Sequence, residues 1–167
     1  RVYGPFWRNW RGQVEQASNL DPLPAPSALI DCDPAQLAEA LQSLPGASPE
    51  LEHGFLEHGF GGAELCPCRP GEQAAQQQLQ AFCDGDGRSI ALLGYEPGRN
   101  IPGEAGTSGL SAALKFGTLS PRQAWAAAQQ ARQLARSEEQ LHSIQVWEQE
   151  LAWREFYQQA LFHFPEL

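Results

Sequence analysis

Long apolar runs, closely spaced cysteines and alternating apolar–polar stretches are all scarce in this sequence of 167 residues. A membrane-spanning helix needs about 20 consecutive, mostly apolar residues. No such run occurs, so we expect no association with a membrane. From Pro70 onward the sequence also lacks the alternation that predicts strands, and the expected fold class is therefore mainly α.

The four cysteines are too dispersed to predict a zinc site. Cys66 and Cys68 form the only close pair, and neither a second pair nor a suitably spaced histidine accompanies them. His53 and His58 belong to the tandem LEHGFLEHGF, which we interpret as a short local duplication rather than a metal site. We therefore expect no bound metal, and we expect reduced thiols in a cytoplasmic protein.

The net charge of −9 is unfavourable for binding nucleic acid, because neutralising phosphates requires lysine and arginine. The charge is unevenly distributed, however, and residues 93–136 carry five basic and two acidic side chains. We interpret Arg132 and Arg136 as solvated helix positions. The other three basic residues of this segment are Arg99, Lys115 and Arg122, and they weakly favour contact with nucleic acid.

Capping signals predict helices over most of the chain after Pro70. Ser120 followed by Pro121 indicates a helix start, since serine caps helices and proline suits their first turn. Ser137 with Gln140 has the pattern of a capping box. The predicted helices cover about residues 71–83, 108–116, 121–135 and 138–162, with a further short helix near 34–43.

A run of hydroxyl residues lies where an irregular Gly/Pro segment gives way to an apolar one. Thr107 or Ser108 is the expected N-cap of the helix that follows, and Gly117 is its expected end. Hydroxyls at a helix start, beside a glycine, suit a phosphate or diphosphate. Simple capping without any ligand is the alternative interpretation.

The segment WEQELAWREFY, residues 147–157, concentrates aromatic and charged residues on one side of a predicted helix. At about 100° per residue, five side chains fall within an arc of roughly 120°. They are Trp147, Glu150, Trp153, Arg154 and Tyr157. Such a face is typical of a pocket for a large, flat, polar ligand. The alternative is an ordinary buried helix in which Glu150 and Arg154 form an i, i+4 ion pair.

These motifs together resemble the DNA photolyase and cryptochrome flavoproteins. The details are most similar to the class I cyclobutane pyrimidine dimer photolyases. The resemblance covers Tyr95, Arg99, TSGLS from Thr107, Gly117, LSPR from Leu119 and the segment from Trp147 to Tyr157, and more weakly YGPFWRNW from Tyr3.

The resemblance also implies a domain organisation, in which the chain is an internal fragment of a longer protein. Residues 1–14 would be the tail of an N-terminal α/β antenna domain, and residues 15–70 an interdomain linker. Residues 71–167 would be the N-terminal part of the all-helical FAD-binding domain of photolyases. We expect the isolated fragment to be inactive.

The resemblance further implies the site residues. FAD would be bound by Tyr95, Thr107, Ser108, Gly109, Leu110, Ser111, Trp147 and Arg154. Glu150 and Trp153 would be the catalytic residues, in contact with a flipped pyrimidine dimer. The implied DNA-binding residues are Arg99, Glu150, Trp153, Arg154 and Tyr157.

The implied activity is light-driven repair of ultraviolet-damaged DNA, in which excited reduced flavin donates an electron that splits the cyclobutane dimer. A second antenna chromophore, of the folate or deazaflavin type, would occupy the N-terminal domain, and the protein would be a monomer. One alternative is a cryptochrome, a blue-light photoreceptor without repair activity. A second is a helical interaction module without a cofactor.

Overall fold

The computed structural model describes residues 3–17, 19–27, 33, 35–36, 39–40, 69–84 and 90–166. The chain divides into two compact units, Arg1–Pro22 with Pro70–Leu167, and Leu23–Arg69. Cys66, Cys68, His53 and His58 lie outside the described residues, so the structure does not test what the sequence predicts for them. Of the short helix predicted near 34–43, only residues 35–36 and 39–40 are described, and they are helical.

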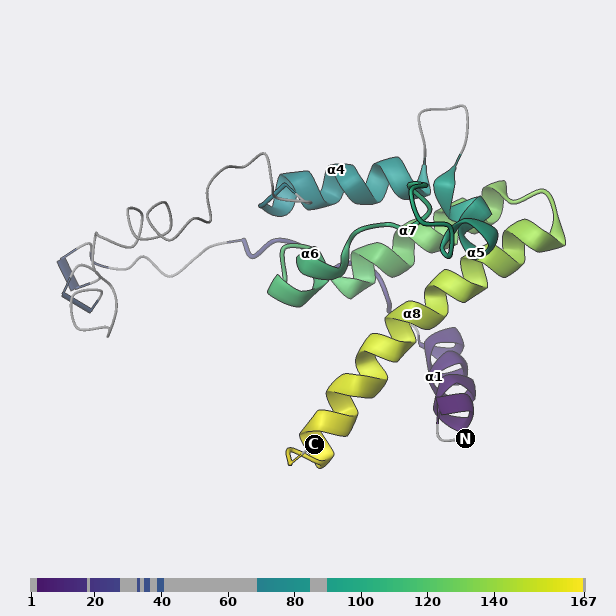
Figure 1. The fold of residues 1–167 in the computed structure, drawn as a ribbon. Helices are drawn as coiled ribbons and strands as arrows, with labels where there is room; N and C mark the ends of the chain where they lie inside the picture. Colours follow the sequence, from purple (N-terminus) through teal and green to yellow (C-terminus); the bar gives the residue numbers. More distant parts are fainter. Residues whose placement is uncertain are drawn as a thin grey trace. The chain divides into compact units, whose positions relative to one another are not determined.

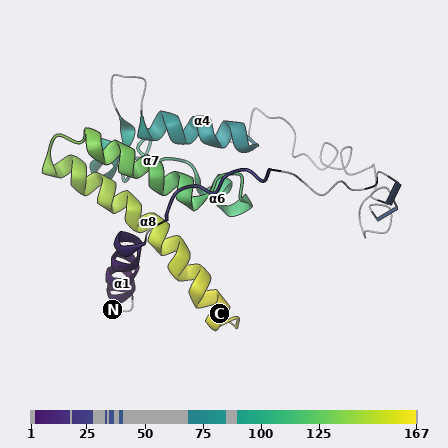
Figure 2. The same cartoon turned by 180° about the vertical axis from the view of Figure 1, so that it is seen from behind.

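The first unit is built from helices, which confirms the mainly α fold class. Its elements are α1 (Tyr3–Gln16), α4 (Glu72–Cys83), the 3-10 turn η2 (Ala91–Gly94), α5 (Tyr95–Gly98), α6 (Ser111–Phe116), α7 (Pro121–Leu134) and α8 (Glu138–His163). The long helix α8 contacts α1, η2, α5 and α7 and is the element around which the unit is organised. Figures 1 and 2 both show α1 alongside the middle of α8. No helix in the described ranges is both long and apolar enough to cross a bilayer.

Helix α7 begins where the sequence predicts. The Ser120 side chain accepts a hydrogen bond from the backbone N–H of Arg122, and the Gln123 side chain accepts one from the backbone N–H of Ser120. Pro121 occupies the first turn, where its missing N–H does no harm. The reciprocal bonds form a capping box and fix the start of α7.

The cap of α8 agrees only in part with the predicted box. The Ser137 side chain accepts from the backbone N–H of Gln140, as expected. The Gln140 side chain, however, accepts from the backbone N–H of Arg136 at 2.6 Å instead of from that of Ser137. The second bond of the predicted box is therefore displaced by one residue.

Helix α6 starts later than the sequence predicts. The N-cap is Leu110, not Thr107 or Ser108, and the first helical residue is Ser111. Gly109 has a φ of +63°, a left-handed conformation that interrupts any helix running through it. The predicted end is confirmed, because Gly117 follows α6 with a φ of +73°.

The core is a cluster of buried side chains from α4, η2, α5, α6, α7 and α8. Three small residues of α7, Ala124, Ala128 and Ala131, are fully buried, and small side chains let two helices approach closely. Helix α8 contributes Ile144 and Leu151 to the same cluster. This packing fixes the side of α8 that faces the candidate site.

Helix α1 was not predicted, because Gly4, Pro5 and Gly12 lower its helix propensity. It is held on the rest of the unit by aromatic contacts. The ring centroids of Phe6 and Phe156 are 5.2 Å apart, and those of Trp10 and Trp125 are 5.5 Å apart. The assignment of residues 1–14 to a preceding domain stays a prediction.

Candidate functional site

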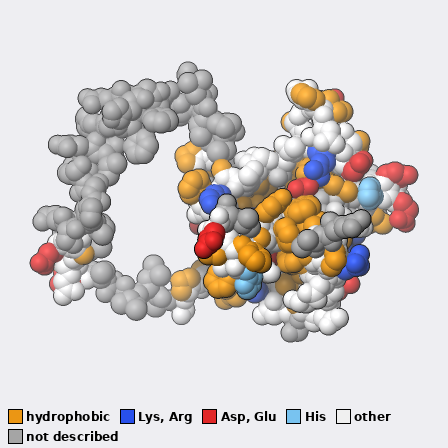
Figure 3. All heavy atoms as spheres, turned by 60° about the horizontal axis from the view of Figure 1, so that its bottom comes forward, with side chains coloured by type: hydrophobic (Ala, Val, Ile, Leu, Met, Phe, Trp, Pro, Cys, Tyr) orange, Lys and Arg blue, Asp and Glu red, His pale blue; other side chains and the backbone are white. Residues whose placement is uncertain are grey.

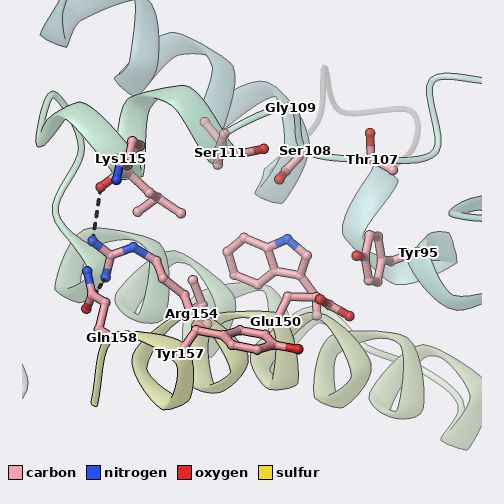
Figure 4. Close-up of a pocket in the computed structure, with 14 residues that line it drawn as sticks. Tyr95, Thr107, Ser108, Gly109, Ser111, Lys115, Glu150, Arg154, Tyr157 and Gln158 are labelled. Atoms are coloured by element: carbon pink, nitrogen blue, oxygen red, sulfur yellow. Dashed lines mark hydrogen bonds between the residues drawn. The ribbon is translucent and has the colours of Figure 1, made fainter. Parts of the chain in front are cut away.

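An open pocket of about 660 Å³ lies between α5, the segment before α6, α6 itself and α8 (Figure 4). All eight residues that the sequence predicts to bind a cofactor line it. Glu150 and Tyr157, two of the predicted DNA-binding residues, line it as well. The structure thus brings together two segments that lie almost 40 residues apart in the sequence.

The apolar wall of the pocket is preorganised by contacts beneath it. Trp147 is 3% exposed, and its ring lies 5.7 Å from that of Phe82 in α4. Phe82 also makes an edge contact with the ring of Tyr95 at 6.1 Å. One buried phenylalanine, which was not among the predicted site residues, therefore supports two aromatic side chains of the pocket.

The segment that carries the hydroxyl groups is held by close backbone contacts. The Gln78 side chain donates a hydrogen bond to the carbonyl oxygen of Ser108 at 2.8 Å. A Cβ atom at Gly109 would lie 2.5 Å from Nε2 of Gln78, and one at Gly106 would lie 2.2 Å from the carbonyl oxygen of Gly98. Glycine at both positions therefore lets the segment approach α4 and α5.

An ion pair joins α8 to the residue after α5. Nη1 of Arg99 lies 2.6 Å from Oε1 of Glu150, and the Arg99 guanidinium lies over the Tyr95 ring at 5.2 Å. The hydrogen bond from Glu150 raises the pKa of Arg99, and burial raises the pKa of Tyr95. Arg99 itself does not line the pocket, but it orients Glu150, the one acidic side chain among the lining residues.

The alternative pairing of Glu150 with Arg154 is wrong, because Glu150 pairs with Arg99. Arg154 donates to the carbonyl oxygen of Leu114 at 3.1 Å and to the side chain of Gln158 at 3.4 Å. These contacts hold the Arg154 side chain at one end of the pocket, as Figure 4 shows.

Trp153 is not among the residues that line the pocket. Its indole stacks on Tyr3 of α1, with ring centroids 3.3 Å apart, and on Tyr157 at 5.5 Å. Tyr157 itself is 59% exposed. The predicted role of Trp153 in contacting a flipped base stays a prediction.

Four further residues line the pocket without having been predicted: Leu114, Lys115, Leu151 and Gln158. Helical periodicity could have found Gln158, which lies four residues after Arg154 and hence on the same side of α8. Lys115 lies in the last turn of α6, and its place in the pocket depends on how the tertiary structure positions α6.

Glu148 of α8 is a fully buried carboxylate outside the pocket lining, and it was not among the residues predicted from the sequence. It accepts hydrogen bonds from Arg11 at 3.0 Å, Gln129 at 2.8 Å and Arg132 at 2.8 Å. The interpretation of Arg132 as a solvated position is therefore wrong. A buried carboxylate needs such partners, and this cluster ties α1 and α7 to α8.

Hydrophobic side chains are also exposed near the end of α8. Phe162 and Phe164 are 81% and 63% exposed, and Phe116 at the end of α6 is 81% exposed. Figure 3 shows hydrophobic side chains interspersed with charged ones on one face of the molecule.

Comparison with known proteins gives a consistent picture, although no family model matches the chain. The chain is 51% identical over 166 residues to a deoxyribodipyrimidine photo-lyase of a Synechococcus species, covering 99% of the chain and 32% of that protein. It is 41% identical over 170 residues to the deoxyribodipyrimidine photo-lyase of Escherichia coli, covering 100% of the chain and 30% of that protein.

A solved structure agrees with these sequence matches. The crystal structure of a class III photolyase from Agrobacterium tumefaciens matches with a TM-score of 0.59 and 33% identity. The match covers 99% of the chain and 30% of that structure. The assignment to class I within the family stays a prediction.

The chain spans about a third of the length of these relatives. Within that third the match runs along 99% of the chain, and residues from three of the motifs line one pocket: Tyr95, the segment from Thr107 to Ser111, and the segment from Trp147 to Tyr157. Along its whole length, the chain is therefore homologous to one segment of the photolyase family.

Proposed function

We propose that this chain supplies part of the FAD and lesion site of a deoxyribodipyrimidine photo-lyase, which splits cyclobutane pyrimidine dimers in ultraviolet-damaged DNA. The observation that carries the proposal is that all eight predicted cofactor-binding residues line one pocket. The names of the relatives support the reaction, and the chemistry of the pocket supports the cofactor.

The residues present fit FAD. The pocket volume of about 660 Å³ lies within the range of small-molecule sites. Trp147 and Leu151 offer apolar surface for a flat ring system, while Thr107, Ser108 and Ser111 offer hydroxyls for polar groups. When bound, the flavin would supply light-driven electron transfer to the dimer.

In this proposal Glu150 recognises a base of the dimer. Its Oε1 is held by Arg99, and among the described residues its Oε2 has no hydrogen-bond partner. An oriented carboxylate with one free oxygen can accept a hydrogen bond from a base N–H. Extruding a damaged, poorly stacked nucleotide into the pocket costs less than extruding an intact one.

The wider organisation is proposed on the same resemblance. Residues 1–14 would end an antenna domain that holds a folate or deazaflavin chromophore, and residues 15–70 would link it to the flavin domain. The complete protein would be a cytoplasmic monomer, and the isolated chain would be inactive.

The test uses the protein expressed from the complete reading frame that contains this chain. Its flavin is reduced, and the loss of cyclobutane dimers from ultraviolet-damaged DNA is followed in blue light and in darkness. We expect loss in the light only, and we expect Glu150→Ala to abolish it while flavin remains bound.

Two other results would favour a different function. Bound flavin without repair would move the assignment to a cryptochrome-like photoreceptor. A protein that binds no flavin would contradict the proposal and favour a helical interaction module.

A further inference from the structure

The pocket has two chemically different ends. Figure 4 shows Tyr95 and Thr107 at one end, and Lys115, Arg154 and Gln158 at the other. Lys115 is the only lysine in the sequence, and it lines the pocket.

The charge at the second end is not compensated by the protein. Across the part of the chain that the structure describes, neither Lys115 nor Arg154 forms an ion pair with a carboxylate. Arg154 is instead held by neutral oxygens, the carbonyl of Leu114 and the side chain of Gln158. Glu150, the acidic residue of the pocket, is already paired with Arg99.

The pocket is therefore locally positive in a chain whose net charge is −9. The two cations lie at one end of the pocket, and the hydroxyl residue Ser111 lies on the same helix as Lys115. Together these groups form a donor set that suits phosphate oxygens. Arginine offers several fixed donors, whereas lysine acts as a compact point charge. A neutral ligand would leave both charges unpaired.

On the basis of the proposed function, we propose that Lys115 binds a phosphate oxygen of the flavin cofactor together with Arg154. Lys115 is thus a specificity-determining residue, which makes the pocket prefer FAD to riboflavin. Riboflavin carries the same ring system but no phosphate, so it would gain nothing from either cation.

The test titrates the flavin-free complete protein with FAD and with riboflavin. We expect Lys115→Gln to weaken FAD binding about tenfold, the size of one charge-assisted hydrogen bond. Riboflavin affinity should not change, and Lys115→Arg should retain most of the FAD affinity. The preference of the parent for FAD should shrink as salt is raised, because ions screen exposed charges.

A matched control separates local from general charge effects. Arg136 is exposed and does not line the pocket, so Arg136→Gln removes one positive charge without touching the proposed site. We expect Arg136→Gln to leave both affinities unchanged. Equal weakening of FAD binding by Lys115→Gln and Arg136→Gln would overturn the inference.

Two outcomes distinguish the inference from the function on which it rests. If the parent binds FAD and Lys115→Gln binds it equally well, or loses FAD and riboflavin to the same extent, the inference alone is overturned. If the parent binds neither flavin, the proposed function fails and the inference fails with it.

Discussion

The phenol ring of Tyr3 lies flat on the indole of Trp153, with 3.3 Å between ring centroids and 6° between ring planes. The Tyr3 hydroxyl also donates a hydrogen bond to the carbonyl oxygen of Gln149 at 3.0 Å. A side chain of α1 therefore covers one face of Trp153, the residue that the family resemblance predicts to contact a flipped base. Binding a base on that face requires Tyr3 to move.

Substitutions at Tyr3 should separate the stack from its hydrogen bond. Tyr3→Phe keeps the ring and loses the bond to Gln149, so we expect it to lower the free energy of unfolding by about 1 kcal/mol. Tyr3→Ala also loses the stack with Trp153 and should cost about 2 kcal/mol or more. Urea denaturation measures both. Equal losses for the two variants would show that the stack contributes nothing.

Removing the charge of Glu148 should lower the free energy of unfolding more than either substitution at Tyr3. Glu148→Gln would leave Arg11 and Arg132 beside an uncharged, fully buried side chain. Breaking a buried pair from one side typically costs about 3 kcal/mol or more. Glu15 also pairs with Arg11 but is exposed, so Glu15→Gln should change stability by less than about 1 kcal/mol. Similar losses for the two variants, measured by thermal unfolding, would contradict this account of the cluster.

Alanine at two glycines should have opposite effects. Gly106→Ala would place a Cβ against the Gly98 backbone, so the segment before α6 must shift and the pocket with it. We expect lower stability and weaker flavin binding. Gly12 lies within α1, and a Cβ atom there would meet nothing within 4 Å, so Gly12→Ala should stabilise the chain by about 0.5–1 kcal/mol. Tighter or unchanged flavin binding by Gly106→Ala would count against the close approach.

Stability should fall at alkaline pH. Burial raises the pKa of the Cys83 thiol from 9.0 to about 12. Above pH 9 the thiol loses its proton in the unfolded state but keeps it in the folded state. The folded state therefore binds this proton more tightly than the unfolded state. This contribution is complete below pH 9 and is lost as the pH rises from 9 to about 12. The free energy of unfolding of Cys83→Ala should depend less steeply on pH in this window. An unchanged slope would contradict the assigned burial.

Local signals predicted the parts of the fold that depend on neighbouring residues. Ser120 and Pro121 start α7, and Gly117 ends α6, because each acts through its own backbone conformation or its nearest turn. The late start of α6 was missed because Gly109 adopts a left-handed conformation, which a hydroxyl-rich segment alone does not reveal. The short elements η2 and α5 were missed for a related reason, since a helix of one turn leaves almost no periodic pattern.

The site residues that belong to family motifs were predicted from the sequence. Those whose place in the site depends only on tertiary packing were missed. Tyr95 and Trp147 belong to recognised motifs, whereas Phe82, which supports both rings, belongs to none. Tyr3 and Trp153 lie 150 residues apart in the sequence, and nothing local indicates their contact. Glu148 was missed because its partners come from α1 and α7, and an acidic helix position is usually solvated.

The most direct test of the central claim compares the flavin absorption of the purified complete protein with that of two tryptophan variants. Ser111 is exposed and lines the pocket, so Ser111→Trp fills the pocket without altering the core. Gln133 is exposed on α7 and does not line the pocket, so Gln133→Trp is the control. We predict stoichiometric flavin in the parent and in Gln133→Trp, and its loss in a folded Ser111→Trp protein. Stoichiometric flavin in Ser111→Trp would show that the cofactor binds elsewhere.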